Sequence, residues 1–576
     1  MFRGIWVPHH LLFNQLKSIY VHILLIFLLL VSCSGNEDHT PDPTPSDVPL
    51  TCTFLAVDGL SETSNKYTDV KTDPVIEITF STALEPLSVS QAVSLTDKDG
   101  RTIKLNLSFG KGDSLLIIRP AGLLDWLTKY NLSVTTALKS KNGSSLIAQL
   151  SVSMITALDS TDKYPVIPDD ELLTLVQKQT FRYFWEFGHP ISGMARERST
   201  SGDVVTTGGT GFGIMAMIAA VEREFITREE AVGRILQVTC FLKNNCTRYH
   251  GAFAHWVNGA TGQTQPFSQK DNGADLVETS FLFQGLLTAR AYFTKADPAE
   301  HELRTIITEL WEAVEWNWFC RDNEQVLYWH WSPDYEWAMN HQISGWNECL
   351  ITYVLAASSP IYPIYKNVYE KGWARNGEIR NNGTYYGYTL PLGEAYGGPL
   401  FFAHYSFLGL NPNGLKDSYA DYWEQNTHHA MIHYEYCRKN PSGYYGYSAD
   451  CWGLTASDGN NGYNAHSPTN DKGVIAPTAA LSSMPYTPEQ SMAALRFFYY
   501  KLGDKLWKEY GFTDAFNLTE KWYDTQFLAI DQGPVIVMIE NHRTGLLWDL
   551  FMSCGEVQAG LTKLGFSINH NNRSSQ

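Results

Sequence analysis

The hydrophobic periodicity of this 576-residue chain changes once along its length, and that change limits the possible folds more than any other feature. Between residues 52 and 158, apolar residues alternate with polar ones in short runs such as 75–80 and 114–120, and turn sequences such as Asn142-Gly143 separate the runs. This pattern is typical of β-strands. After residue 168 the apolar residues recur at helical spacing, and no run of alternation competes with them. The sequence therefore predicts a multidomain protein in which an all-β part precedes an all-α part.

The two parts have the lengths of known architectures. Residues 51–158 suit an immunoglobulin-like (Ig-like) β-sandwich, which needs roughly 100 residues. A short polar linker follows, and Pro168 with three acidic residues opens the first helix. Further helices are expected at 212–224, 227–244, 275–294, 298–319, 345–357, 415–439, 488–502, 520–525, 533–541 and 555–564. Long loops rich in Gly, Tyr, Trp and Asn join them, so we expect residues 167–576 to form an (α/α)6 toroid whose loops surround one cleft.

The amino-terminal segment has the pattern of an exported lipoprotein. The apolar run 23–32 is too short to span a bilayer, which takes about 20 residues, but it suits a signal peptide over residues 1–32. Residues 30–33 resemble a bacterial lipobox, so Cys33 is the expected lipidation site and membrane anchor; the alternative is an uncleaved leader with a chance cysteine. Residues 33–50, rich in Pro, Asp, Ser and Thr, read as a disordered tether. We expect anchoring to the outer membrane, on its periplasmic face or at the cell surface.

Charge and cysteine spacing exclude several classes of partner. The formal net charge of −17 argues against nucleic acid, because binding a polyanion requires Lys and Arg. Eight cysteines besides Cys33 are scattered without a Cys-x-x-Cys pair, so neither a zinc site nor a disulfide framework is expected. His428, His429 and His433 lie close together, but no acidic partner completes a metal geometry. We therefore expect no metal, no cofactor and a monomer.

Three carboxylates stand where an apolar helix should begin. Asp271, Asp275 and Glu278 are four and three residues apart, a spacing that places side chains on one helix face. The apolar run 281–287 follows, so the acids are expected at the mouth of a buried helix. Acids crowded there favour sugar chemistry. The structural alternative is that an aspartate caps the helix and Glu278 meets its positive end.

Five ordered motifs carry a family resemblance. They lie at 206–214, 271–278, 398–406, 452–459 and 532–541, and together they resemble the glucoamylase-like domain of glycoside hydrolase family 144 over about residues 167–566. The segment before them resembles the bacterial Ig-like repeats of exported proteins. The resemblance implies an (α/α)6 enzyme that cleaves β-1,2-glucan by inversion, either internally or by releasing sophorose from an end. A related domain occurs in cyclic β-1,2-glucan synthases, so transglycosylation stays open, as does a surface glycan-binding protein without turnover.

Inverting hydrolysis needs an acid and a base from distant segments, roughly 6.5–9.5 Å apart. By resemblance, Glu348 matches the family's general acid; it is expected in the first turn of an apolar helix, whose surroundings would keep it protonated. Its structural alternative is to stabilise the helix dipole. Asp531 is the candidate base by family position, just before a helix that we expect to start at Pro534, although an ordinary cap explains it equally well.

Other residues keep the assignment of the base open. Asp450, Asp458 and Glu540 lie in motifs that also look functional, and any of Asp271, Asp275 and Glu278 could be the base instead of binding sugar hydroxyls or completing a proton path.

Aromatic and glycine-rich loops complete the candidate substrate site. Tyr386 and Trp452 are the candidate stacking residues, and the tyrosines at 385–388 and 444–447 are either sugar platforms or loop packing. The glycines at 208–213 invite a phosphate interpretation, but no preceding strand of a βαβ unit and no following Lys-Ser/Thr supports it. They are expected instead to let a loop pass close to sugar.

Overall fold

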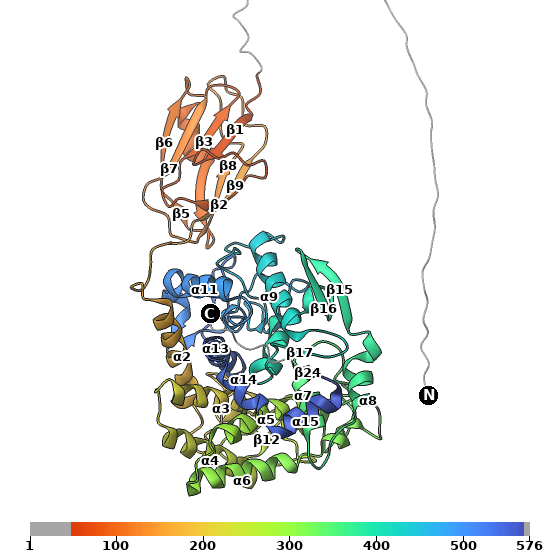
Figure 1. The fold of residues 1–576 in the computed structure, drawn as a ribbon. Helices are drawn as coiled ribbons and strands as arrows, with labels where there is room; N and C mark the ends of the chain where they lie inside the picture. The colour runs from red at the N-terminus through yellow and green to blue at the C-terminus, as the bar shows by residue number, and fades with distance from the viewer. Residues whose placement is uncertain (1–47, 569–576) are drawn as a thin grey trace, which may run out of the picture.

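The computed structural model describes residues 48–568. The predicted signal peptide, the lipidation site Cys33 and most of the predicted tether fall outside this range. Within it, a β-sandwich stands on a larger helical domain (Figure 1). Among the described residues, no helix combines the length and apolar character that crossing a bilayer would require.

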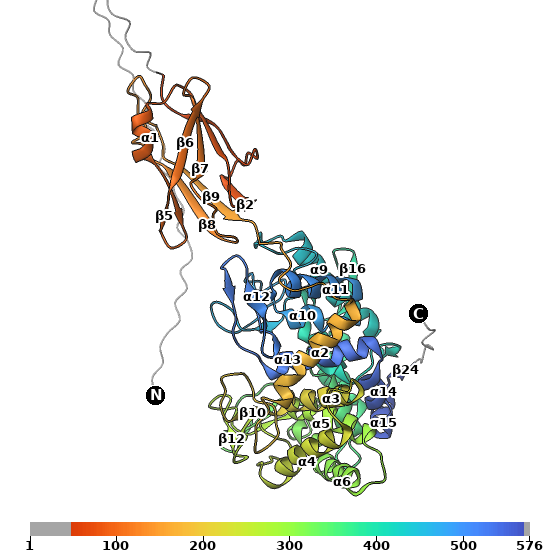
Figure 2. The same ribbon diagram turned by 90° about the vertical axis from the view of Figure 1, so that its left-hand side faces the viewer.

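Two packed sheets form the amino-terminal domain (Figure 2). Ile76, Ile78 and Phe80 are buried while the residues between them are half-buried, which confirms the alternation read from the sequence. One sheet has the order β1-β3-β7-β6: Cys52–Val57, Ile76–Phe80, Leu115–Pro120 and Leu105–Gly110. The other has the order β2-β9-β8-β4-β5, with β2 parallel to β9: Lys66–Val70, Leu150–Thr156, Lys129–Val134, Val93–Asp97 and Thr102–Ile103. Helix α1, Pro86–Ala92, leads into β4.

The second domain is predominantly helical, as expected. Its longer helices are α2 (Asp169–Trp185), α3 (Thr207–Glu222), α4 (Arg228–Asn244), α5 (Leu276–Tyr292), α6 (Pro298–Glu312), α7 (Leu350–Ser358), α9 (Tyr422–Lys439), α11 (Pro488–Arg496), α13 (Ala529–Arg543) and α15 (Gly555–Leu564). Shorter ones are α8 (Lys366–Val368), α10 (Pro477–Leu481), α12 (Gly503–Leu506) and α14 (Leu546–Met552). Turns of other helix types are η1 (Trp316–Cys320), η2 (Tyr369–Trp373), η3 (Arg375–Gly377), η4 (Ala395–Gly397), η5 (Leu400–Ala403), η6 (Tyr405–Leu408) and η7 (Phe497–Lys501).

Short strand pairs decorate the loops between these helices. They are β10 (Val204–Thr206) with β11 (Trp256–Asn258) and β12 (Thr264–Gln265); β13 (Ala274–Asp275) with β14 (His330–Trp331); β15 (Arg380–Tyr385) with β16 (Tyr388–Leu392); β17 (Leu415–Lys416) with β24 (Ser567–Ile568); β18 (Ala456–Ser457) with β19 (Asn464–Ala465); β20 (Trp507–Lys508) with β21 (Gly511–Phe512); and β22 (Phe516–Asn517) with β23 (Trp522–Tyr523). The predicted helix over 520–525 is therefore wrong, and the expected absence of strands after residue 168 fails most clearly at the β15–β16 hairpin. These pairs depend on partners across a loop, which local periodicity does not encode.

Helices α3 and α5 touch through their backbones. A Cβ placed on Gly211 would lie 2.1 Å from the carbonyl oxygen of Phe281, and one on Gly285 would lie 2.2 Å from that of Gly211. Only glycine permits this approach. The glycine-rich segment 208–213 therefore belongs to a buried helix, and the expectation that it forms a loop close to sugar is wrong.

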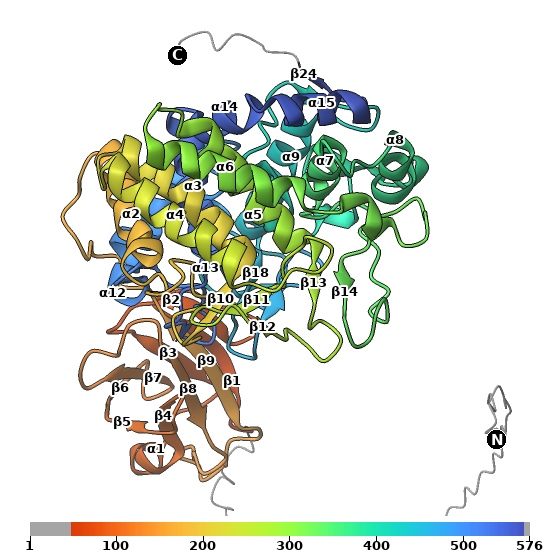
Figure 3. The ribbon, with the colours of Figure 1, turned by 90° about the horizontal axis from the view of Figure 1, so that it is seen from below.

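The site-bearing loops gather on one side of the helical domain. Seen from below, α14 and α15 run along one side, and the short strands β10, β11, β12 and β18 lie along the opposite side (Figure 3). Helix α5 begins at this second side, directly after β13. The acidic motif before α5 is thereby placed among the loops, at the end of a helix whose first fourteen residues are buried.

The segment between the domains is seated on the helical domain. The backbone N–H of Lys163 donates to the carbonyl of Tyr500 at 2.7 Å, and Tyr164 stacks on Tyr499 with ring centroids 4.7 Å apart. Across the interface, the hydroxyl of Tyr445 donates to Asp69 Oδ1 at 2.8 Å. The predicted polar linker is thus a structured connection between the two domains.

Candidate active site

Asp275 organises the acidic motif. It is the N-cap of α5: its Oδ1 accepts the backbone N–H groups of Val277 and Glu278 at 3.0 and 2.9 Å. Such a cap contributes about 1 kcal/mol. Its Oδ2 lies 3.0 Å from His255 Nδ1 and accepts the indole N–H of Trp329 at 3.2 Å. Because both oxygens are engaged and the side chain has no exposed surface, the structure contradicts the predicted sugar contact for Asp275 and supports the capping alternative.

Glu278 and Asp271 flank this cap. Glu278 Oε2 accepts the backbone N–H of Gly208 at 2.8 Å, so the start of α3 is tied to the start of α5. Asp271 Oδ2 lies 3.3 Å from His330 Nε2. Burial, with the charge of Asp275 next in weight, raises the pKa of Asp271 to about 7.

His255 supplies positive charge to the motif. Burial opposes its charged form, but the carboxylates of Glu278, Asp275 and Asp271 outweigh burial and raise its pKa to about 9. His330 behaves in the opposite way, because burial lowers its pKa to about 4. The motif therefore holds one imidazolium among three acids at neutral pH.

Glu348 lies beside this acidic motif. It is two residues before α7 begins at Leu350, not in the first turn as expected, and its carbonyl accepts the hydroxyl of Ser406. Its side chain is half-buried. Burial raises the pKa of Glu348 to about 7, and the nearby charges of Glu278 and Asp275 act in the same direction. A carboxyl group in this environment keeps its proton at neutral pH far better than a solvated one.

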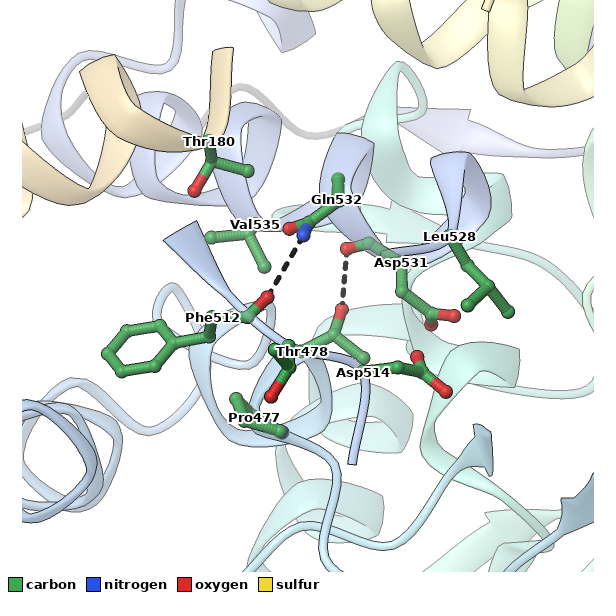
Figure 4. Close-up of a pocket in the computed structure, with 10 residues that line it drawn as sticks. Thr180, Pro477, Thr478, Phe512, Asp514, Leu528, Asp531, Gln532 and Val535 are labelled. Atoms are coloured by element: carbon green, nitrogen blue, oxygen red, sulfur yellow. Dashed lines mark hydrogen bonds between the residues drawn. The ribbon is translucent and has the colours of Figure 1, made fainter. Parts of the chain in front are cut away.

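Asp531 occupies the first turn of α13. The helix begins at Ala529, so Pro534 lies inside the helix and is not its first residue. The side chain of Asp531 faces that of Asp514, from the segment between β21 and β22 (Figure 4). Both are 4% exposed. Burial raises the pKa of Asp531 to about 7, and a hydrogen bond from Asp514 opposes the rise.

Tyr405 connects the two catalytic candidates. Its ring is buried, and its hydroxyl group lies near the Asp531 carboxyl group, whose pKa it acts to lower. Burial raises the pKa of Tyr405 well above its usual value, and the charges of both Asp531 and Glu348 act on it in the same direction. The structure thus brings Glu348 and Asp531, far apart in the sequence, around one tyrosine.

The remaining predicted residues have other surroundings. Trp452 is wholly buried and its indole N–H donates to the carbonyl of Gln490 at 3.2 Å, which contradicts a stacking role. Tyr386 is half-buried at the turn of the β15–β16 hairpin, where Lys439 lies 4.8 Å from its ring centroid, so its sugar contact stays a prediction. Glu540 is excluded as a base, because Arg223 holds its carboxylate at 2.8 Å and the pKa of Glu540 is lowered despite burial.

Two half-exposed aromatic rings at the site were missed in the sequence. Phe267 is 51% exposed and its ring centroid lies 4.5 Å from that of His255. Tyr463 is 52% exposed as a whole residue, while burial of its hydroxyl group and the charges of Asp531 and Asp514 raise the pKa of that group. Both have the exposed faces on which sugar rings stack. Neither belongs to an aromatic run, so the sequence carries no signal for them.

Within residues 48–568, two groups of side chains are close enough to surround a cation, and a positively charged side chain already contacts the carboxylates of each group. One is His255, Asp271 and Asp275. The other is Asp458, Asp514 and Asp524, where Arg198 donates to Asp458 Oδ2 at 2.9 Å. His255 within the first group and Arg198 beside the second supply positive charge, so we assign no metal to either. His429 and His433 both bond to the carbonyl of Gly398, at 2.9 and 2.8 Å, and serve the loop that precedes Tyr405.

Comparison with known proteins adds the family to this geometry. The Glycoamylase family model ("Putative glucoamylase") matches residues 340–555, and a bacterial Ig-like domain model matches residues 61–156. A crystal structure of a "putative glucoamylase" from Bacteroides uniformis is 59% identical, with a TM-score of 0.70, and covers 71% of this chain and 100% of its own. The chain belongs to this glucoamylase-like family. The finding confirms the resemblance read from the sequence, with the Ig-like domain at the amino-terminal side.

Two further relatives of this family member carry activities in their names. An endo-β-1,2-glucanase from Chitinophaga pinensis, solved with sophorotriose and glucose, is 52% identical with a TM-score of 0.68, covering 70% of this chain and 99% of its own. An exo β-1,2-glucooligosaccharide sophorohydrolase of Parabacteroides distasonis is 50% identical over 427 residues, 70% of this chain. The aligned part spans 59% of that relative's length.

Proposed function

We propose that this protein hydrolyses β-1,2-glucan with inversion, using Glu348 as general acid and Asp531 as general base. The observation that carries the proposal is a pair of carboxyl groups from distant segments, Glu348 and Asp531, which both lie near Tyr405 and whose pKa values burial raises to about 7. The substrate class rests on the two named relatives, which share the β-1,2 linkage and differ in endo or exo action.

The environments of the two acids suit opposite tasks. Glu348 has burial and the negative field of Glu278 and Asp275 to keep its proton, which a general acid must deliver to the leaving glycosidic oxygen. Asp531 has the hydroxyl of Tyr405 and the cation of Arg198 to favour its ionised form, which a base requires. Although Glu348 and Asp531 have similar pKa values, their different neighbours favour the protonated form of Glu348 and the ionised form of Asp531.

The proton balance of the step is simple. Glu348 gives its proton to the leaving oxygen as the glycosidic bond breaks, and Asp531 takes a proton from the water whose oxygen bonds to the anomeric carbon. Water attacks the face opposite the leaving group, so a β-linked substrate gives an α-anomer first. Both residues then return to their starting states by exchange with bulk water.

The architecture and location are part of the proposal. The helices would close into an (α/α)6 toroid over residues 167–576, with the Ig-like domain over residues 51–158 as a spacer. We also propose export as a monomer, anchored to the outer membrane through Cys33. The half-exposed rings of Phe267 and Tyr463 would serve as sugar-stacking faces beside the acids.

The test is a time course of products from linear β-1,2-glucan, followed by chain length, reducing ends and anomeric configuration. Wild type should give new reducing ends and an early α-anomer, and Glu348→Gln should lose roughly 10²–10⁴ of the rate. Glu302→Gln, on the exposed face of α6, is the matched control and should retain the rate. Binding without new reducing ends would show a glycan-binding protein, and altered chain lengths with a constant number of ends would show a transglycosylase.

A further inference from the structure

The carboxyl group of Asp514 faces Asp531 and has no assigned role. Its Oδ2 accepts the backbone N–H of Asp458 at 2.7 Å. In the part of the chain that the structure describes, its Oδ1 and both oxygens of Asp531 have no hydrogen-bond partner. Figure 4 shows the two carboxyl groups pointing toward one another. Buried polar atoms without partners are rare, so this arrangement needs an explanation.

A single proton between the two groups explains it. Two facing carboxylates are both acceptors and repel each other, whereas a carboxylic acid and a carboxylate form a short, strong hydrogen bond. With 4% exposure on each side chain, water does not screen the repulsion. One shared proton therefore gives a partner to Asp514 Oδ1 and to one oxygen of Asp531, and the second oxygen of Asp531 keeps no protein partner.

The surrounding groups decide which residue carries it. Asp458 and Asp524 place negative charge beside Asp514, and the cation of Arg198, 2.9 Å from Asp458, also acts on Asp531. Tyr405 and Tyr463 face Asp531 from η6 and from the β18–β19 loop. Burial, followed by the charge of Asp531, raises the pKa of Asp514 well above its usual value, whereas the Tyr405 hydroxyl and the Arg198 cation act to lower the pKa of Asp531.

We propose that Asp514 is a positioning residue that stays protonated and donates its O–H to Asp531, so that Asp531 remains the ionised partner aimed at water. This deepens the proposed function and rests on Asp531 being its base. During turnover Asp531 accepts a proton from water, the pair then holds two, and one is released to solvent before the next cycle. The proton on Asp514 is kept throughout.

Asparagine reproduces the neutral acid at position 514. Its oxygen accepts the N–H of Asp458 and its amide N–H₂ donates to Asp531, which is the pattern proposed for Asp514. Leucine has similar size without a donor. The dependence of kcat/KM on pH should therefore differ between the two variants. If residue 514 had only a structural role, the position of the acidic limb would not depend on whether its side chain can donate a hydrogen bond.

Asp514→Asn should keep kcat/KM within roughly tenfold of wild type, with the acidic limb in the same place, because one hydrogen bond replaces another. Asp514→Leu should move the acidic limb to higher pH by about one unit. Its kcat/KM at a given pH on that limb should therefore lie about tenfold below that of wild type. Equal loss in both variants would mean that a charge at 514 is needed and would overturn the proposal, as would equal retention with an unmoved limb.

A second measurement does not depend on turnover. The difference between the infrared spectra of folded wild type and Asp514→Asn at pH 7 should contain the C=O band of one protonated carboxyl group, because Glu348 and Asp271 contribute to both spectra. The same band should also appear in the difference between Asp531→Asn and the double variant Asp531→Asn with Asp514→Asn. Its absence from the first difference would refute a proton on Asp514. Asp531→Asn also separates the two proposals. If this variant is active, Asp531 is not the base. If it is inactive while the Asp514 variants keep the wild-type pH profile, only the positioning role of Asp514 is refuted.

Discussion

Shifting the pH by two units to either side of neutrality should slow the enzyme strongly, and the structure supplies the magnitude. Glu348 must be protonated and Asp531 ionised, and both have a pKa of about 7. At pH 7 each is in the required form half of the time, so about a quarter of the molecules are competent. At pH 5 only about 1% of Asp531 is ionised, and at pH 9 only about 1% of Glu348 is protonated, so kcat/KM should fall about 25-fold on each side.

The assay is kcat/KM for a β-1,2-linked oligosaccharide between pH 5 and 9. Tryptophan fluorescence over the same range is the control, since unfolding would imitate the limbs of the profile. Wild type should give a narrow bell centred near neutrality, and Glu348→Gln should lose the alkaline limb from its residual rate. A rate that is flat across this range in folded protein would refute the assignment of either acid, because no titrating pair would then control turnover.

Two further predictions concern stability. Gly211→Ala should lower the free energy of unfolding by about 1–3 kcal/mol or more, because its Cβ would lie 2.1 Å from the Phe281 carbonyl oxygen. Gly233→Ala is the matched control, because nothing lies within 4 Å of a Cβ at that position. Equal melting temperatures of the two variants would contradict the close packing of α3 and α5. Burial lowers the pKa of His429 to about 4, so the unfolded chain binds more protons below pH 6.5 and stability is lost as pH falls from there toward 4. His429→Gln should flatten this decline in denaturant titrations at several pH values, and an unchanged slope would contradict it.

Much of the fold was readable because periodicity is a local signal. Alternating burial in β3 and the acidic opening of α2 both follow from residues adjacent in sequence. Helix ends were less accessible: Pro534 looks like a first residue, yet α13 starts five residues earlier because Leu528 and Ala529 are held by contacts with the segment around Glu197 and Arg198. Such contacts join positions more than 300 residues apart.

The site divides in the same way. The motifs led to Glu348 and Asp531, and the cap role of Asp275 was one of the alternatives considered. The sequence carries no signal for Asp514, because a single aspartate in a loop becomes a candidate only when the fold places Asp531 opposite it. The burial of Trp452 was equally hidden, because the same aromatic residue serves as a platform or as core depending on what packs over it.

The seated connection between the domains has a consequence for where one unit stops and the next begins. The N–H of Ile167 donates to the Tyr500 hydroxyl at 3.0 Å, and the N–H of Leu158 donates to the Tyr445 hydroxyl at 3.1 Å. A fragment cut at the first turn of α2 would strip these phenols of their partners and uncover the face of Tyr499. The helical domain therefore starts upstream of α2, at the end of the β-sandwich. The connecting segment packs on this domain as its outermost layer and is not a free hinge.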